Sequence, residues 1–435
     1  MCAPAGDARR YYLPIKWLMG LACALLLVGC GNEFRPVAIP IIPPGGTPQA
    51  QKQAVVLSQA TSSGAAIPGS ATNINVSGDT LFAVRAVGLH PVHAGLVANQ
   101  ARVLIANQDD DTLSTYLTFA TLSLGTTTTI TLPAGSKPVF VHTREASNAY
   151  VALHGPDPAC GGTNGSVGVI AVNSLTLSGT ICVGAGPIAL AELPNTAKLY
   201  VANQLSDNVT VINTADRSIA ATIAVGSRPS WIDVSADGAF VYVANEGDGT
   251  VTVIDTSKDE TVPTLSPVMV GNGPNFLKFD ASRKRVYVTN QLGNSISIIQ
   301  ADQSLLPAGT FLSVTTVPVG LAPASVTALA NNTKVYVANF GSNTVSVIDA
   351  ATNTVTKTID VGATPLSIDS SPDSAQVFVA NQGMLGTASG SVSVIRTSDD
   401  TKLNPDLALP PPPGSPGPPA APAPVVNPNF LLVTP

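Results

Sequence analysis

Four histidines offer the chain's most versatile side chains for metal binding or acid–base chemistry. They are His90, His93, His142 and His154. Imidazoles that meet in a folded protein can hold a transition metal. No two of these histidines have the spacing of a known metal motif, and the sequence contains no Cys-x-x-Cys-His haem site. We therefore expect ordinary loop and strand histidines, and we assign no metal ligand and no cofactor.

Other chemistry-bearing patterns are weak. Asp109, Asp110 and Asp111 could offer oxygens to calcium, but they lack the spacing of a known calcium loop, so a solvated acidic turn is preferred. The sequence contains no Gly-x-Ser-x-Gly, no Gly-x-x-x-x-Gly-Lys-Ser/Thr and no His-Glu-x-x-His. We assign no catalytic residue, and an enzyme is the less favoured class of protein.

The N-terminus has the pattern of an export signal. Basic residues precede an apolar stretch from Trp17 to Val28, which is too short to cross a bilayer but suits a signal peptide. The stretch ends in Leu27-Val28-Gly29-Cys30, which resembles the lipobox of bacterial lipoproteins. The resemblance implies a signal peptide at residues 1–29 and a lipid on Cys30, with the protein anchored to the outer membrane or cell surface of the bacterial envelope. An ordinary secretory signal with an incidental Cys30 is the alternative.

The remaining cysteines suggest a disulfide. Cys2 and Cys23 would leave with the signal peptide, and Cys30 would carry the lipid. Cys160 and Cys182 are then an even pair in an exported protein, where disulfides form and persist. We expect these two to be bridged, and two free thiols are the alternative.

Two short phrases recur along the chain and indicate the elements that position these residues. One is an apolar-aromatic run ending in Asn, such as Leu199 to Asn203, and the other is Gly-x-x-Pro, such as Gly226 to Pro229. The Gly-x-x-Pro turns begin at intervals of 42 to 49 residues, at Gly88, Gly135, Gly184, Gly226, Gly271, Gly320 and Gly362. This period, with several short Val/Ile/Thr/Tyr-rich runs per unit, is typical of β-propeller blades. The expected fold is all-β, a seven-bladed β-propeller of four-stranded antiparallel blades at residues 76–400.

The flanks of the repeat array lack strand patterns of comparable strength. Residues 30–75 are predicted to be a flexible tether rich in Pro, Ser, Ala and Gly, and residues 401–435 a Pro-rich tail. The last unit has no convincing outer strand, whereas Leu81 to Val87 precedes the first turn. We therefore expect this N-terminal strand to complete the C-terminal blade, which would remove the open edge of the ring.

The repeats resemble a known family. Tyr287-Val288-Thr289-Asn290 spells the motif of the YVTN family of β-propeller repeats, and Tyr200 to Asn203, Tyr242 to Asn245 and Tyr336 to Asn339 differ by one residue. The resemblance covers roughly residues 80–397 and implies a propeller like those of bacterial and archaeal surface proteins. It does not specify an activity, because the shared residues build blades. We expect each Tyr to be in the core and each Asn to tie its own turn.

The expected fold places the Gly-x-x-Pro turns and the loops after each second strand on one face, around the central channel. This follows from the alternating strand direction within a blade. The binding-face candidates are His90, Lys137, His154, Arg228, Glu246 and Asp248.

Composition narrows the function. The net charge is -6 and only 11% of residues are charged, so we expect no nucleic-acid partner. The preferred hypothesis is a monomeric, noncatalytic binding or scaffold module for an envelope protein or polysaccharide, held to the membrane only by its lipid. The alternative is a propeller hydrolase of the lactonase type with a site on the channel face.

Overall fold

The structure is a computed structural model that describes residues 53–62, 65–76, 80–97, 102–118, 127–144, 147–262, 266–304, 311–384, 389–413 and 424–433. They belong to one compact unit, residues 49–435. The signal peptide and Cys30 lie outside the described residues, and so do the first residues of the expected tether. Within the described ranges, no helix is long and apolar enough to span a bilayer.

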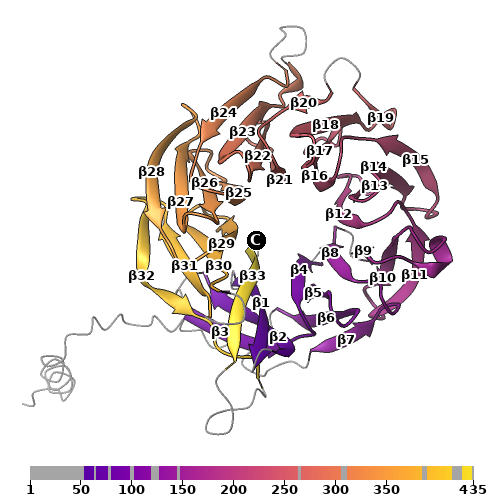
Figure 1. Ribbon diagram of the computed structural model, residues 1–435, viewed down its shortest axis with the longest axis horizontal. Helices are drawn as coiled ribbons and strands as arrows, with labels where there is room; N and C mark the ends of the chain where they lie inside the picture. Colours follow the sequence, from indigo (N-terminus) through magenta and orange to yellow (C-terminus); the bar gives the residue numbers. More distant parts are fainter. Residues whose placement is uncertain are drawn as a thin grey trace, which may run out of the picture. The chain divides into compact units, whose positions relative to one another are not determined.

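Eight antiparallel sheets stand as blades around a central opening (Figure 1). Seven of them, blades 1 to 7, follow the repeats in chain order. Their strands are, in blade 1, β4 (Pro91–Leu96), β5 (Arg102–Asn107), β6 (Thr112–Leu117) and β7 (Thr128–Thr131); in blade 2, β8 (Pro138–His142), β9 (Asn148–Leu153), β10 (Ser166–Ala171) and β11 (Thr176–Cys182); in blade 3, β12 (Pro187–Glu192), β13 (Lys198–Asn203), β14 (Asn208–Asn213) and β15 (Ile219–Ala224); in blade 4, β16 (Pro229–Val234), β17 (Phe240–Asn245), β18 (Thr250–Asp255), β19 (Glu260–Thr261) and β20 (Val268–Met269); in blade 5, β21 (Pro274–Asp280), β22 (Arg285–Asn290), β23 (Ser295–Gln300) and β24 (Val314–Pro318); in blade 6, β25 (Pro323–Ala328), β26 (Lys334–Asn339), β27 (Thr344–Asp349) and β28 (Thr354–Asp360); and in blade 7, β29 (Pro365–Ser370), β30 (Gln376–Asn381), β31 (Ser391–Arg396) and β32 (Thr401–Ala408).

The eighth sheet, the terminal blade, joins the two ends of the described chain. From the channel outward it contains β33 (Val425–Val433), β1 (Gln53–Ser62), β2 (Ala65–Asn75) and β3 (Thr80–Ala86) (Figure 1). The all-β fold and the four-stranded antiparallel blades were predicted correctly, but the number of blades was not. The propeller has eight blades instead of seven.

Ring closure also differs from the prediction. The strand at residues 81–87 was expected to complete the last repeat blade. Instead, β32 completes blade 7, and β3 is the outer strand of the terminal blade. Three N-terminal strands and one C-terminal strand form the terminal blade, in place of the single N-terminal strand that was expected. Of the three, β1 pairs with β33 and places Leu57 opposite Phe430.

The predicted boundaries of tether and tail change for a physical reason. Residues 54–57 in the predicted tether are fully buried in β1, and β32 and β33 lie in the predicted tail. Small and β-branched side chains resemble a linker in composition, yet they also suit a strand packed closely between two blades. Burial and cross-strand pairing therefore make these segments strands, which their composition did not predict.

The second strand of each repeat blade forms the core. In β13, β17, β22 and β26, one half-buried residue is followed by five buried ones. Tyr200, Tyr242, Tyr287 and Tyr336 occupy the same position in these strands and are fully buried. Strands lie on both sides of each second strand and blades cover both faces, so the run is continuously apolar instead of alternating.

The Asn at the end of the second strand ties the next turn to the third strand. Asn245 Nδ2 donates to Thr250 Oγ1 at 3.0 Å and to Thr252 Oγ1 at 2.9 Å. Gly226 of the same blade lies against this amide, and a Cβ there would be 2.7 Å from Asn245 Cγ. The two repeated phrases are therefore parts of one contact. Equivalent amide contacts are made by Asn107, Asn203, Asn290, Asn339 and Asn381.

The terminal blade contacts blade 1 through a buried polar network. The Arg85 guanidinium lies 4.4 Å from the ring centroid of Tyr116. Its Nη1 donates to Asn73 Oδ1 at 3.3 Å, and the Tyr116 hydroxyl donates to the same oxygen at 3.0 Å. Asn73 Nδ2 donates to Gln53 Oε1, whose own Nε2 donates to the carbonyl of Thr118. These contacts join the terminal blade to blade 1, and on its other side the Leu431 N–H of β33 donates to Ser367 Oγ of blade 7 at 3.2 Å.

Blade 2 carries the disulfide. Cys160 in the short 3₁₀ helix η1 (Pro158–Cys160) is bonded to Cys182 at the end of β11, with a Cα–Cα distance of 5.3 Å. This is the pair that the sequence suggested.

Candidate functional site

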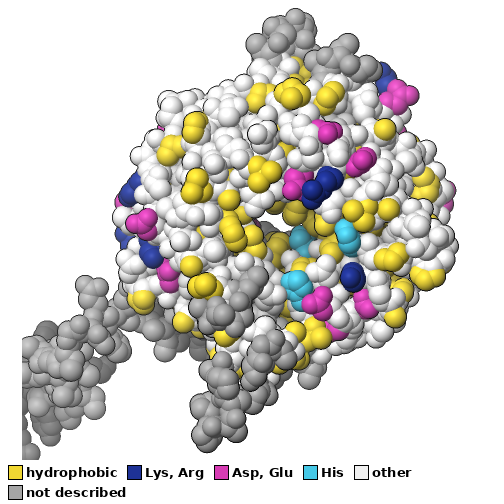
Figure 2. Space-filling view, in the orientation of Figure 1, with side chains coloured by type: hydrophobic (Ala, Val, Ile, Leu, Met, Phe, Trp, Pro, Cys, Tyr) yellow, Lys and Arg dark blue, Asp and Glu magenta, His cyan; other side chains and the backbone are white. Residues whose placement is uncertain are grey.

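The predicted binding-face residues lie at the same end of their blades. The backbone N–H of His154 donates to the carbonyl of Lys137 at 3.1 Å, and that of Glu246 donates to Arg228 at 3.0 Å. Each Gly-x-x-Pro turn is therefore next to the loop that follows the second strand. Figure 2 shows histidine, basic and acidic side chains around the central opening on the face in view.

These residues form separate contacts instead of one cluster. Arg228 Nη2 lies 3.3 Å from Glu246 Oε2, and His90 Nδ1 lies 3.3 Å from Asp109 Oδ2. The carboxylate of Asp248 accepts the backbone N–H of Ser227, so it joins the loop after β17 to the turn before β16. Pairs at an exposed rim contribute little stability and leave their outer surfaces free to meet a ligand.

The two other rim features are structural in part. Burial lowers the pKa of His154, whose Nδ1 is buried without a hydrogen-bond partner in the described structure. Asp111, in the acidic run, accepts the backbone N–H groups of Lys137 at 2.8 Å and Gly135 at 2.6 Å. The run therefore fastens blade 1 to blade 2.

The inner strands contain a second repeated pattern. The residues two and four positions after the proline of each turn lie on the same side of the strand. In blades 2, 4 and 5, the second residue is aromatic and the fourth is ionisable. These pairs are Phe140 and His142, Trp231 and Asp233, and Phe276 and Lys278.

The aromatic members form an arc along one side of the channel. We define the aromatic arc as Phe430, His93, Phe140, Trp231 and Phe276, from the inner strands β33, β4, β8, β16 and β21. Successive ring centroids are 4.5, 3.9, 5.4 and 4.6 Å apart. The equivalent position is small in blades 3, 6 and 7, where it holds Ala189, Ser325 and Ser367. Ala189 of blade 3 interrupts the aromatic side between blades 2 and 4, and Ser325 and Ser367 place hydroxyl-bearing side chains in blades 6 and 7.

His93 belongs to the arc as a neutral ring. The backbone N–H of Val141 donates to His93 Nδ1 at 3.2 Å, and the ring stacks on Phe140. Burial, together with the charge of nearby His142, lowers the pKa of His93 to about 3. With Nδ1 accepting a hydrogen bond, the neutral ring carries its proton on Nε2.

Ionisable side chains follow the aromatic residues further along the inner strands. We define the lumen charge set as His142, Glu192, Asp233, Lys278 and Asp369. His142 Nε2 lies 3.3 Å from Glu192 Oε2, and Lys278 Nζ lies 3.3 Å from Asp369 Oδ1. Glu192 is fully buried, and neither of its carboxylate oxygens accepts a hydrogen bond within the described residues.

Asp233 differs from the other members of the set. Its two carboxylate oxygens accept the backbone N–H groups of Val234 and Phe279, each at 2.8 Å. Among the described residues it forms no ion pair. Burial raises the pKa of Asp233, while these hydrogen bonds and the charges of Lys278 and His142 oppose the rise. The Asp369 carboxylate raises the pKa of Lys278, so this ammonium stays protonated.

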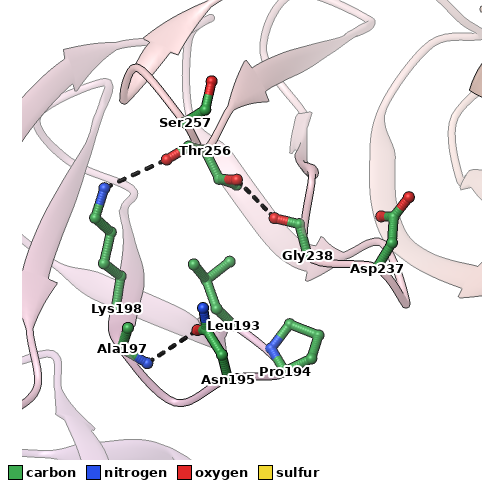
Figure 3. A pocket seen from close by; sticks show the side chains of 9 residues that line it. All are labelled: Leu193, Pro194, Asn195, Ala197, Lys198, Asp237, Gly238, Thr256 and Ser257. Atoms are coloured by element: carbon green, nitrogen blue, oxygen red, sulfur yellow. Dashed lines mark hydrogen bonds between the residues drawn. The ribbon is translucent and has the colours of Figure 1, made fainter.

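A notch between blades 3 and 4 is a less suitable site. It has a volume of about 370 Å³ and is lined by residues that include Leu193, Lys198, Asp237 and Thr256 (Figure 3). Lys198 Nζ donates to the carbonyl of Thr256 and to Asp259 at 2.6 Å. Because its cation already holds blade 3 to blade 4, the notch has a structural role.

The described residues contain no group of three or more His, Cys, Asp or Glu side chains that could hold a metal ion. The channel instead combines flat aromatic surfaces, hydroxyls and ion-paired side chains. This combination suits hydrogen bonding and stacking with a polar ring.

Sequence reasoning missed the inner-strand residues because it examined the turns alone. The available signal was the spacing Pro, aromatic, ionisable at Pro138, Pro229 and Pro274, which repeats at alternate positions. Asp369 follows Pro365 at the same spacing as the other ionisable residues, but Phe430 could not have been placed beside them, because β33 enters the site through ring closure.

Two family models match parts of the chain. One, described as lactonase, 7-bladed beta-propeller, matches residues 177–307, and one described as choice-of-anchor I domain matches residues 275–408. Each covers less than a third of the chain. No curated protein matches it.

Solved structures share the fold at low sequence identity. Dihydro-heme d1 dehydrogenase NirN in complex with DHE has a TM-score of 0.63 at 12% identity, covering 81% of this chain and 73% of that one. Apo AztD from Citrobacter koseri has a TM-score of 0.57 at 11% identity, covering 88% and 98%. A candidate 6-phosphogluconolactonase from Bacteroides fragilis has a TM-score of 0.55 at 17% identity, covering 74% and 98%. The chain is therefore a β-propeller protein, and residues 177–307 are similar to the model of the lactonase, 7-bladed beta-propeller.

Proposed function

We propose that this protein is a noncatalytic binding module that captures an envelope polysaccharide at the propeller channel. The observation that supports it most is the two-sided channel wall, with the aromatic arc facing the small and hydroxyl-bearing positions of blades 6 and 7. A pyranose ring has the same division, since its C–H face is apolar and its edge carries hydroxyls. Aromatic side chains would stack on the C–H face, and the polar groups would bond the edge.

The rim supports the same proposal. Arg228 and Glu246 at an outer turn add charged hydrogen-bonding groups where a polymer would leave the channel. A polysaccharide chain is long enough to contact both rim and lumen, whereas the lumen alone would hold only its end. We place the protein at the bacterial envelope, where the lipid on Cys30 would anchor it and the choice-of-anchor match is in keeping with a surface role.

Binding can be followed inside the channel. Trp17 and Trp231 are the only tryptophans of the chain, so a fluorescence change on adding polysaccharide reports on Trp231. We expect purified envelope polysaccharides to quench or shift this emission, and Phe276→Ala to weaken binding about tenfold by calorimetry, a loss of about 1.4 kcal/mol. Phe240→Ala, in the Phe240–Phe311 contact outside the arc, is the control. Equal affinity of the wild-type and Phe276→Ala proteins would contradict binding in the channel.

The proposed location has a separate test. Metabolic labelling with a radioactive fatty acid should mark the wild-type protein and leave Cys30→Ser unlabelled. Labelling that persists in Cys30→Ser would reject that cysteine as the lipid site.

A lactonase-type hydrolase is the second candidate, favoured by the family match at residues 177–307 and by the His142–Glu192 pair. In this proposal His142 would take a proton from water as the water attacks the lactone carbonyl, and Glu192 would stabilise the imidazolium formed. Hydrolysis of 6-phosphogluconolactone, followed by acid release at constant pH, tests it. Activity that falls at least about a hundredfold in Glu192→Gln would establish a hydrolase, and no turnover would remove this candidate.

A further inference from the structure

We propose that the channel selects an amino sugar, a pyranose ring that stacks on Trp231 and Phe276 and places a protonated amine beside Asp233. This inference rests on the proposed polysaccharide-binding function and names the class of sugar unit that the lumen accepts.

The first argument is the unequal pairing within the lumen charge set. Lys278 is matched by Asp369, and His142 by Glu192, each at 3.3 Å. Asp233 has only backbone N–H donors, and in the described structure no cationic side chain lies within ion-pairing distance of it. A ligand ammonium would supply the missing counter-ion.

The second argument is the charge balance of the channel. The set has three carboxylates, on Glu192, Asp233 and Asp369, but one ammonium and one imidazole, and the Arg144 guanidinium donates to the backbone carbonyl of Glu192. The arc adds no positive charge, because His93 is neutral at any pH well above 3. Aromatic faces attract cations, so Trp231 and Phe276 next to Asp233 favour an ammonium over a carboxylate or phosphate.

The third argument is the spacing along a single strand. Trp231 and Asp233 are two residues apart in β16 and lie on the same side of it. Their Cα atoms are therefore separated by about 7 Å along the strand. That distance lets one pyranose ring rest against the indole while its amine reaches the carboxylate. Phe276 and Lys278 repeat the arrangement on the neighbouring inner strand, where Lys278 can donate to a ring hydroxyl.

The proposal predicts a pH dependence. Lys278 and the N–H of Phe279 approach Asp233 from β21, and His142 acts from β8 with Glu192 of β12 behind it. Burial raises the pKa of Asp233, and a bound ammonium would lower it again. Binding should therefore release protons, and affinity should rise as the pH increases through the raised pKa of Asp233.

The experiment compares two ligands of the same length, one with a charged ammonium and the other with a neutral acetamide on each sugar unit. The full-length protein is titrated with a glucosamine hexamer and with an N-acetylglucosamine hexamer, using Trp231 fluorescence and calorimetry. We expect the glucosamine hexamer to bind at least about tenfold more tightly. Asp233→Asn should abolish this preference while still binding the acetylated hexamer, which shows that the variant is folded.

The control variant Asp216→Asn removes one carboxylate from an exposed outer turn, and it should keep the preference. Equal binding of the two hexamers by the wild-type protein would overturn the amino-sugar inference and leave polysaccharide binding intact. A preference that survives in Asp233→Asn but disappears in Asp216→Asn would assign it to surface charge and also overturn the inference. Failure of both hexamers, together with failure of every envelope polysaccharide, would reject the proposed function itself.

Discussion

The seven repeat blades and the terminal blade are all antiparallel but differ in how the chain assembles them. In a repeat blade, the first three strands pair in the order of the sequence, as Tyr242 does with Val253. In the terminal blade, Leu57 pairs with Phe430 from the opposite end of the chain. Local pairing closes short loops, whereas the terminal pairing closes nearly the whole chain.

This difference is reflected in the contacts that hold each kind of blade. The repeat blades reuse one contact, in which an Asn amide joins the turn to the third strand. The terminal blade uses the network of Arg85, Asn73, Gln53 and Tyr116, which occurs once. Sequence repetition therefore identifies the contact that the repeat blades share. It does not identify the contacts that close the ring, because those occur once.

The largest expected effect is the loss of ring closure. Deleting residues 424–435 removes β33, which packs against blades 1 and 7 and contributes Phe430 to the aromatic arc. We expect the truncated protein to expose the edge of β1 and to aggregate or unfold at a much lower temperature. Calorimetry and light scattering measure this. A synthetic peptide of residues 424–433 should restore part of the stability, and an unchanged melting temperature after deletion would contradict the closure.

Breaking the terminal network at one residue should have the next largest effect. Arg85→Met keeps much of the side-chain volume but loses the cation–π contact with Tyr116 and the hydrogen bond to Asn73. We expect the free energy of unfolding to fall by about 2 to 3 kcal/mol, measured by denaturant titration. Arg102→Met, in β5 of the neighbouring blade 1 and half-buried, should cost less. Equal losses in the two variants would mean that the network has no special role.

Equivalent contacts between repeat blades should give equal and smaller effects. Lys198 and Tyr200 of blade 3 bind Asp259, and Lys334 and Tyr336 of blade 6 bind Asp400 in the same way. Asp259→Asn and Asp400→Asn should each lower the free energy of unfolding by about 2 kcal/mol.

Because the two contacts share no residue, the double variant should lose the sum of the single losses. Denaturant titration of the singles and the double measures this. A strongly non-additive double variant would show that the blades do not act as separate units.

The smallest expected effect concerns the junction of the two kinds of blade. His93 of blade 1 lies 4.5 Å from Phe430 of the terminal blade, and burial lowers its pKa from 6.5 to about 3. Below pH 6.5 the His93 side chain binds a proton in the unfolded chain but not in the folded protein. The free energy of unfolding therefore declines as the pH falls from 6.5 toward 3. From pH 7 to pH 5.5 this amounts to about 1 kcal/mol.

The variant His93→Gln removes this titration and should flatten the profile over the same interval. Thermal unfolding at each pH measures the difference between the two proteins. Parallel profiles for wild type and variant would show that acid acts elsewhere in the ring.

The blade core and the turns could be predicted from the sequence because they depend on neighbours in the chain. The buried Tyr residues, the Asn contacts and the strand order within each repeat blade all follow from phrases of six or fewer residues, repeated at a regular interval. The Cys160–Cys182 bond was also foreseen from residue counting. The rim candidates were placed at the correct ends of their strands, and they form separate pairs there.

The eighth blade and the lumen could not be read in this way. Residues 54–57 look like part of a linker because their side chains are apolar and mostly small, yet the long-range pairing of β1 with β33 buries them. Trp231, Asp233 and Lys278 resemble ordinary strand residues until seven inner strands and β33 surround one channel.

By itself, the sequence determined the repeating unit, since hydrophobic periodicity and turn chemistry act over a few residues. Only the tertiary structure decided the number of blades, the closure of the ring and the residues that meet in the channel. Those features depend on contacts between segments far apart in the chain, and the propeller geometry selects those contacts.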